Sequence, residues 1–396
     1  MIIEDVAIRR IIDSRGNPTV EAEIRTNSGF GRAAAPAGAS TGTHEAVAWP
    51  NGDVSKGIQF AEEKLMPGLI GRTVEDQKSF DKILRETDGT NNFRNMGGNI
   101  SVAFSLAAAK AAANSKNISL YQHVGNKTEY SLPAPMANVL GGGAHAIGGT
   151  DIQEYLVTSF DKDINTAIEA NAMVHKKVGS LLKDKFPNIA LGKGDEGAWV
   201  APLGNIEALE LVVKAANQIE QETGVEIRPG LDIAASEFYH NGKYKYKEQT
   251  LTAEQQVDFV LGMIEEYNLH SVEDPLDQED FESWALLTEQ TDALIIGDDL
   301  YVTNTERLKK GIEMNSTNSI LIKPNQIGTL TDTINAVELA KQADMATVIS
   351  HRSGETTDTT IAHLGVAFDS HAIKTGIMGG ERIAKLNELV RISEEL

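Results

Sequence analysis

The feature of the sequence that most constrains the fold is a pattern repeated between Leu269 and Lys374. A short, mainly apolar run, a polar residue at its end and a segment of helical character follow one another in turn. The polar residues lie 25, 25, 27 and 24 positions apart, and they are Glu273, Asp298, Lys323, Ser350 and Lys374. This spacing is close to the length of one strand–helix unit, and buried parallel strands read as continuous apolar runs. The pattern therefore predicts an α/β fold with a (β/α)8-type barrel, which carries its active site at the carboxyl ends of the strands.

The N-terminal third of the chain predicts a separate, smaller domain. Residues 6–12, 19–24 and 30–35 have the pattern of an antiparallel meander, and residues 54–124 have helical periodicity with an alanine-rich helix at 101–114. A chain of 396 residues is long enough for two domains. We therefore expect an α+β domain that caps the barrel.

The best boundary between the two domains is the stretch 125–135, which contains two prolines. We expect the N-terminal α+β capping domain at residues 1–127 and the barrel domain at residues 128–396. Elements expected early in the barrel domain are a strand at 136–140, helices at 164–182 and 204–222, a second barrel strand at 190–196 and a hairpin at 238–246.

The composition excludes several classes of function. The 36 Lys and Arg against 57 Asp and Glu give a net charge of −21, which disfavours binding to nucleic acid and to anionic membranes. The chain has no cysteine, so it forms no disulfide and no thiolate metal site. Since we find neither a signal peptide nor a long apolar segment, we expect a cytoplasmic protein that does not associate with membranes.

Three carboxylates end three apolar runs in succession, without histidine or cysteine beside them. They are Asp232, Glu273 and Asp298. Carboxylate oxygens that leave coordination positions open to water and substrate suit Mg²⁺. A single acid of this kind is more often a helix cap or a salt-bridge partner, but three in succession favour a metal site.

Lys323 follows the next apolar run and is the candidate catalytic base. We expect burial and neighbouring cations to lower the pKa of its ammonium group toward the working pH. The alternative is a lysine that pairs with Asp298 for structural reasons only.

Several motifs of this chain occur together, and in the same order, in one known family. They are Asp-Ser-Arg-Gly-Asn-Pro-Thr-Val at 13–20, Gly-Ala-Ser-Thr-Gly at 38–42, Gly-Asp-Glu-Gly at 194–197, Gly-Leu-Asp-Ile-Ala-Ala-Ser-Glu-Phe at 230–238, Ser-Val-Glu-Asp-Pro at 271–275, Gly-Asp-Asp-Leu at 297–300, Lys-Pro-Asn-Gln-Ile-Gly-Thr-Leu at 323–330, Ser-His-Arg-Ser-Gly-Glu-Thr at 350–356 and Glu-Arg-Ile-Ala-Lys at 381–385. With these motifs the chain closely resembles the enolase family over nearly its whole length.

The resemblance implies a fold and a reaction. The fold would be a (β/α)8-type barrel of the enolase kind, and the enzyme would be a glycolytic lyase that interconverts 2-phosphoglycerate and phosphoenolpyruvate with two Mg²⁺ ions per active site. It implies that Asp232, Glu273 and Asp298 bind metal and that Lys323 removes the proton from C2 of the substrate. Because that proton lies next to an ionised carboxylate, its removal creates a second negative charge that bound metal stabilises.

The resemblance also implies roles for the remaining site residues. Glu196 would protonate the departing C3 hydroxyl, with Glu154 as the partner that shares its proton. Substrate-binding residues would be Ser40, Gln153, Arg352, Ser353 and Lys374, with Arg352 and Ser353 at the phosphate and Lys374 at the carboxylate. His145, on a mobile loop like Ser40, and His351, near the phosphate residues, would complete the catalytic set. Family members assemble as homodimers or octamers.

Loops at 46–51, 141–151 and 197–202 depart from the family pattern, so two alternatives stay open. One is a divergent lyase that acts on another anionic carboxylate bearing a leaving group. The other is a non-catalytic surface or scaffold protein, against which Lys323 and Glu196 argue. The absence of Lys-x-Lys from the expected second barrel strand favours elimination over racemisation.

Overall fold

The first three strands of the chain form an antiparallel sheet in the order β1-β2-β3, as the sequence predicts. The structure is a computed structural model that describes residues 1–39, 41–146 and 148–396. Their bounds are Ile3–Ile12, Pro18–Thr26 and Phe30–Ala34. Helix α4 (Gly98–Lys116) packs against β2 and β3. The packing is close enough that a Cβ at Gly31 would lie 2.0 Å from the carbonyl oxygen of Ala107, so this position requires glycine.

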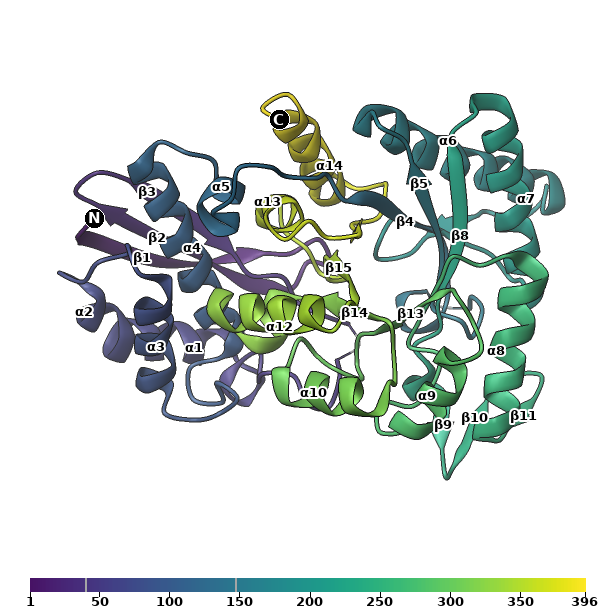
Figure 1. The fold of residues 1–396 in the computed structure, drawn as a ribbon, viewed down its shortest axis with the longest axis horizontal. Coiled ribbons are helices and arrows are strands. Elements are labelled where there is room, and N and C mark those ends of the chain that lie inside the picture. Colours follow the sequence, from purple (N-terminus) through teal and green to yellow (C-terminus); the bar gives the residue numbers. More distant parts are fainter. Residues whose placement is uncertain (40, 147) are drawn as a thin grey trace.

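Further helices complete the N-terminal domain, which lies at the left of Figure 1. They are α1 (Val54–Phe60), α2 (Met66–Leu69), α3 (Gln77–Asp88) and α5 (Leu120–Gly125). The alanine-rich helix expected from the sequence is α4, which is buried along most of its length because small side chains let its neighbours approach from several sides.

An eight-stranded barrel follows and confirms the predicted fold class. The strands lie in the order β16-β15-β14-β13-β12-β8-β5-β4, and pairing of β16 with β4 closes the sheet. Their bounds are Ala134–Gly141 (β4), Glu154–Phe160 (β5), Glu226–Asp232 (β8), Ser271–Glu273 (β12), Leu294–Gly297 (β13), Ser319–Ile322 (β14), Ala346–Ser350 (β15) and Ala372–Lys374 (β16).

The second barrel strand is β5 and not the segment 190–196, so that prediction was wrong. Residues Gly192–Lys193 form β6, whose one partner among the described strands is β7 (Trp199–Val200); the two short strands make a hairpin at the barrel rim. Strand β5 runs antiparallel to both of its neighbours. It follows β4 through a loop without a crossover helix, and antiparallel neighbours need no crossover.

Helices surround the barrel, and a small apolar cluster fills it. The cluster consists of Met136, Leu156, Ile296, Leu321, Val348 and Ala372, each from a different strand. The helices are α6 (Ile164–Lys185), α7 (Asn205–Thr223), α8 (Ala253–Tyr267), α9 (Phe281–Thr288), α10 (Thr305–Met314), α11 (Pro324–Ile327), α12 (Leu330–Gln342), α13 (Thr360–Ala367) and α14 (Gly380–Ser393).

Outside the barrel wall, the expected hairpin at 238–246 is formed by β9 (Tyr239–His240) and β10 (Lys243–Lys245), and β11 (Thr250–Leu251) pairs with β10. Asn241 and Gly242 both have positive φ, as a tight hairpin turn requires.

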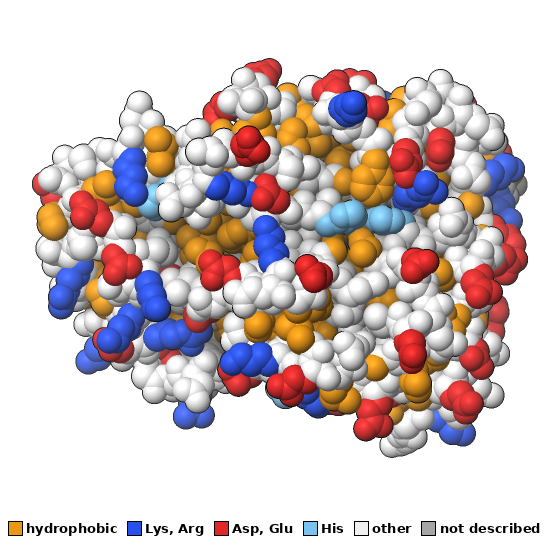
Figure 2. Space-filling model, viewed as in Figure 1, with side chains coloured by type: hydrophobic (Ala, Val, Ile, Leu, Met, Phe, Trp, Pro, Cys, Tyr) orange, Lys and Arg blue, Asp and Glu red, His pale blue; other side chains and the backbone are white. Residues whose placement is uncertain are grey.

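Figure 2 shows Lys and Arg side chains more frequent over the N-terminal domain and acidic side chains scattered over the barrel. In the described parts of the chain, no helix combines the length and apolar character needed to cross a bilayer.

Candidate active site

The strand ends bring the expected polar side chains to one mouth of the barrel. Asp232, Glu273 and Lys374 are the last residues of their strands, and Asp298 and Lys323 follow theirs directly. Glu154 is instead the first residue of β5, but because β5 is antiparallel, Glu154 pairs with Asp232 and reaches the same mouth.

Lys374 lies at the centre of the carboxylates. Its Nζ is 2.7 Å from Glu273 Oε2, 3.0 Å from Asp232 Oδ2 and 3.2 Å from Glu154 Oε2, and all four side chains are buried. Burial opposes the charge of the ammonium group, but these carboxylates outweigh it and raise its pKa well above the ordinary value. Burial together with Asp232 raises the pKa of Glu273. The carboxylates therefore stabilise the charged form of Lys374.

Lys323 donates a hydrogen bond to Asp298, which also accepts one from Gln326 Nε2 at 2.8 Å. The expected decrease in the pKa of Lys323 is not found. Burial acts to lower it, but Asp298 outweighs burial and raises it, so the lysine is an ammonium group in this arrangement.

A buried acid pair lies across the cavity from Lys323. Strands β14 and β5 are four positions apart in the closed eight-stranded order, so Lys323 and Glu154 belong to opposite walls. His145 Nδ1 lies 3.4 Å from Glu154 and 3.9 Å from Glu196, and Asn138 donates to Glu196 at 3.2 Å.

Protonation of this pair follows from burial and from mutual repulsion. Burial and the charge of Glu196 raise the pKa of Glu154. Burial opposes protonation of His145, but Glu196 and Glu154 outweigh it and raise its pKa. Burial also acts to raise the pKa of Glu196, but His351 and His145 outweigh it and lower that pKa well below the ordinary value. The proton of the pair therefore resides on Glu154 in this structure, beside an ionised Glu196, although the sequence predicted Glu196 as the acid.

The residues expected at the phosphate have protein partners here. Both terminal nitrogens of Arg352 lie 3.0 Å from the carboxylate of Glu45, and Ser353 Oγ accepts a hydrogen bond from the backbone N–H of Ala39 at 2.6 Å. Gln153 donates to Asp232 at 3.3 Å, and its Oε1 is buried without a hydrogen-bond partner in the described part of the chain. Ser40 lies outside the described residues.

One polar cavity of about 20 Å³ joins most of the predicted set, and this volume holds about one water molecule. A phosphorylated substrate therefore requires the loops or side chains around it to move. The cavity is lined by Gly38, His145, Gln153, Glu154, Glu196, Asp232, Asp298, Lys323, Ser350, His351, Arg352, Ser353 and Lys374. Glu273 adjoins it through Lys374.

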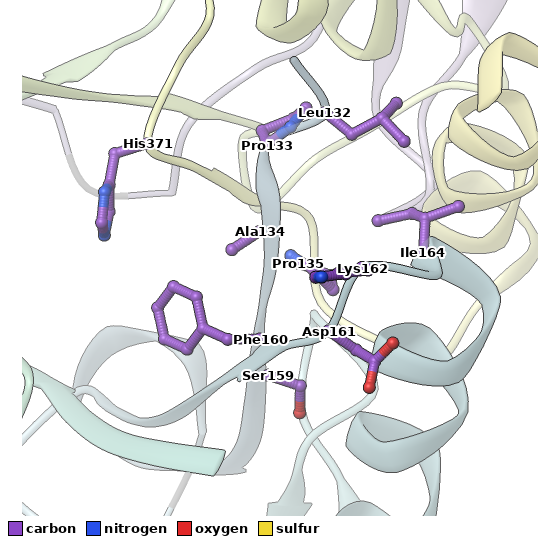
Figure 3. Close-up of a pocket in the computed structure, with 10 residues that line it drawn as sticks. All are labelled: Leu132, Pro133, Ala134, Pro135, Ser159, Phe160, Asp161, Lys162, Ile164 and His371. Carbon is purple, nitrogen blue, oxygen red and sulfur yellow. The ribbon is translucent and has the colours of Figure 1, made fainter. Parts of the chain in front are cut away.

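A larger cavity, of about 620 Å³, lies at the opposite end of the barrel and lacks this chemistry. Figure 3 shows its lining around the start of β4 and the segment that links β5 to α6, with mainly apolar side chains beside His371. His371 and His270 precede β16 and β12, and their Nε2 atoms lie 3.2 Å apart. Size alone therefore does not identify the active site.

Among the described residues, two groups of side chains lie close enough together to share a metal ion, and neither is the trio expected from the sequence. In each group, one ligand atom per residue lies within 4.8 Å of the others; the groups are His145, Glu154 and Glu196, and Asp274, Asp298 and Asp299. The expected trio is divided between two lysines, with Asp232 and Glu273 at Lys374 and Asp298 at Lys323.

Sequence reasoning missed several residues that support the site. Asp274 accepts the backbone N–H groups of Asp298 and Asp299 at 2.9 Å and so fixes the turn after β13. The acidic pairs in Glu-Asp-Pro and Gly-Asp-Asp were a signal for it. Glu45 and Asn138 carry no comparable local signal, since each reaches the site from a distant segment, and Arg382 was marked only as part of the Glu-Arg-Ile-Ala-Lys motif at 381–385.

Comparison with known proteins gives the family of the chain. Residues 3–124 match the N-terminal domain of enolase, and residues 129–396 match its C-terminal TIM barrel domain. The enolase of Methanosphaera stadtmanae is 51% identical over 100% of this chain and 97% of its own length. The enolase of Halobacterium salinarum is 49% identical over 99% of both chains, and that of Thermoplasma acidophilum is 46% identical over 99% of this chain and 98% of its own. The chain therefore belongs to the enolase family of enzymes.

Proposed function

We propose that this chain catalyses the reversible dehydration of 2-phosphoglycerate to phosphoenolpyruvate. The observation that carries the proposal is one polar cavity, which joins a lysine, a buried acid pair, a carboxylate set and the Arg352–Ser353 segment. Relatives that carry the enolase name match the chain over almost their whole length, which supports the same assignment.

The carboxylates at the mouth suit divalent cations, and we propose two Mg²⁺ ions per site, with Asp232, Glu273 and Asp298 as ligands. Their oxygens are the hard donors that Mg²⁺ prefers. They already attract two ammonium groups, from Lys374 and Lys323, which is the behaviour expected of a cation site. Bound there, Mg²⁺ would stabilise the second negative charge that develops on the substrate carboxylate.

Lys323 and the acid pair divide the proton transfers between opposite walls of the barrel. As a neutral amine, Lys323 accepts the C2 proton; as the ammonium group found here, it returns that proton in the reverse direction. The proton of the acid pair, held by Glu154 in this structure, passes to the departing C3 hydroxyl through Glu196.

We propose that Arg352 and Ser353 bind the phosphate, with Ser40 and Gln153 nearby, and that Lys374 binds the substrate carboxylate. The guanidinium fork matches phosphate oxygens, but here it faces Glu45. Since the cavity holds about one water molecule, substrate binding has to open it and exchange part of the Glu45 contact for phosphate. We also propose that the protein is cytoplasmic and assembles as a homodimer or octamer. Within each chain, the boundary between the two domains would lie between residues 127 and 128.

The direct test is steady-state formation of phosphoenolpyruvate, followed by ultraviolet absorbance. Turnover is expected with Mg²⁺, and excess chelator should abolish it. Lys323→Ala should lower kcat at least about a hundredfold, since it removes the base. Lys309→Ala, at an exposed lysine of α10, is the matched control and should keep full activity. A wild-type protein that binds Mg²⁺ without turnover would contradict the proposal.

A further inference from the structure

Arg382 is a buried arginine to which the reaction proposed above assigns no role. It lies on α14, and its side chain is fully buried. Its terminal nitrogens donate to the carbonyl oxygens of Arg352 and Ser353 at 2.6 Å each and to that of Asp195 at 3.3 Å. The guanidinium group therefore holds together two loops that carry catalytic and phosphate-binding candidates.

The same guanidinium group also contacts the imidazole of His351. Arg382 Nη1 lies 2.8 Å from His351 Nδ1. Because guanidinium nitrogens only donate hydrogen bonds, Nδ1 has to accept this one and therefore carries no proton. The proton of a neutral His351 then resides on Nε2.

Nε2 of His351 faces the active-site cavity. It lies 3.2 Å from Glu196 Oε1, but it makes no well-aligned hydrogen bond with a group in the described residues, although it is buried. The N–H of Nε2 thus lies close to Glu196 without being committed to it, and it remains able to bond a substrate oxygen. Such a donor is useful where a hydroxyl leaves.

We propose that Arg382 is a positioning residue that fixes His351 as the neutral Nε2–H tautomer, so that the imidazole presents a hydrogen-bond donor to Glu196 and to the leaving hydroxyl. The identity of the leaving hydroxyl rests on the proposed function. The tautomer itself rests only on the contact between Arg382 and His351.

The groups around His351 keep it neutral. Glu196 faces it from the segment between β6 and β7, Arg382 from α14, and Glu355 from its own loop. Glu196 and Glu355 favour a charged imidazole, but a proton on Nδ1 would point at the guanidinium group 2.8 Å away. Burial is the largest effect, and together with Arg382 it lowers the pKa of His351 to about 4.

A lysine cannot reproduce this arrangement. The planar fork of Arg382 reaches Nδ1 and three carbonyl groups from fixed directions, whereas a lysine offers one ammonium group on a flexible stem. The alternative is a purely structural role, in which Arg382 only joins the loops. The two roles differ in what happens to the imidazole when the arginine is removed.

The decisive measurement is the tautomer of His351 by NMR, with ¹⁵N-labelled histidine and long-range proton–nitrogen correlation between pH 5.5 and 9. The signal is assigned by its loss in His351→Gln. In the wild type we expect the Nε2–H form throughout, without titration. In Arg382→Met we expect a tautomer mixture, or titration that moves toward the ordinary pKa of about 6.5.

The kinetic consequence should follow the tautomer. Arg382→Met should lower kcat about ten- to hundredfold, the range found for groups that orient another side chain, with little change in KM. The pH profile of kcat should gain an ionisation between about pH 5 and 7.

Lys385→Met is the matched control. Lys385 is also buried on α14, donates to the carbonyl oxygens of Thr356 and Glu381 and pairs with Glu355 at 2.9 Å, but it makes no contact with the imidazole among the described residues. Lys385→Met should destabilise the same loop, and the unpaired Glu355 can shift the pKa of His351 upward, but because Arg382 still faces Nδ1, the Nε2–H tautomer should remain as in the wild type.

A single, non-titrating Nε2–H form in Arg382→Met would overturn the proposal, even in an inactive protein. So would a wild-type His351 that carries its proton on Nδ1 or titrates near pH 6.5. If Arg382→Met does not fold, Arg382→Lys serves instead; a changed Nδ1 shift supports the proposal and an unchanged one contradicts it. Because the spectra need no turnover, failure of the dehydration assay would refute the proposed function separately.

Discussion

Lys374→Met tests whether the carboxylates at the barrel mouth require a cation. In the structure one ammonium group serves Asp232, Glu273 and Glu154, at 2.7 to 3.2 Å. Methionine has a similar length but no charge, so the variant leaves three buried carboxylates without their shared counter-ion. Removing one partner of a buried ion pair costs about 3–5 kcal/mol.

The expected loss depends on pH, because Glu273 can reduce it by binding a proton. Burial and Asp232 already raise the pKa of Glu273, and the loss of Lys374 raises it further. We therefore expect the free energy of unfolding to fall by about 3 kcal/mol at pH 8 and by less at pH 6, in excess chelator. The measurement is urea unfolding followed by circular dichroism.

A matched control and a rescue make the result specific. Lys309→Met removes an exposed lysine and should change stability by less than about 0.5 kcal/mol. Added Mg²⁺ should restore more stability to Lys374→Met than it adds to the wild type, because it replaces the missing positive charge. A variant as stable as the wild type in chelator would refute the idea that the carboxylates need a counter-ion.

Two further changes test contacts between distant segments. Lys110 lies 2.8 Å from Asp358. Burial acts to raise the pKa of Asp358, but Lys110 outweighs burial and lowers this pKa from 3.8 to about 2. The shift corresponds to about 2.4 kcal/mol of stability, which is present above pH 4 and is lost as the pH falls toward 2. Asp358→Asn should therefore cost about 2 kcal/mol at pH 7 in urea unfolding and almost nothing at pH 2; an equal cost at both values would contradict the pKa shift. Glu45→Gln keeps the shape of the side chain but removes the charge that balances Arg352. It should therefore lower the free energy of unfolding by about 3–5 kcal/mol in the same assay. A loss below about 1 kcal/mol would show that this ion pair is not important for stability.

The local pattern of the sequence determined most of the architecture. Apolar runs at intervals of 24 to 27 residues correspond to β12, β13, β14, β15 and β16, because strand and helix periodicity are local properties of the chain. The polar residues at the ends of those runs lie at one mouth for the same reason. The motifs then identified the family, and every described residue of the predicted set lines the cavity or adjoins it.

The direction of β5 was decided only by closure of the barrel. A parallel second strand was expected at 190–196, whereas the strand that pairs with β4 and β8 is antiparallel and begins with Glu154. Periodicity is the same in both directions of a strand, so it does not reveal which end of β5 reaches the mouth.

Charge balance inside the site was likewise decided by contacts across the fold. Lys374 pairs with residues 101 and 142 positions away, and Glu45 and Arg352 are 307 apart. These contacts determine which side chain is charged, and they raise the pKa of Lys323 where local reasoning expected a decrease. The sequence by itself determined which chemical groups reach the mouth of the barrel; the tertiary structure decided how they share charge, because electrostatic partners are selected by distance in space.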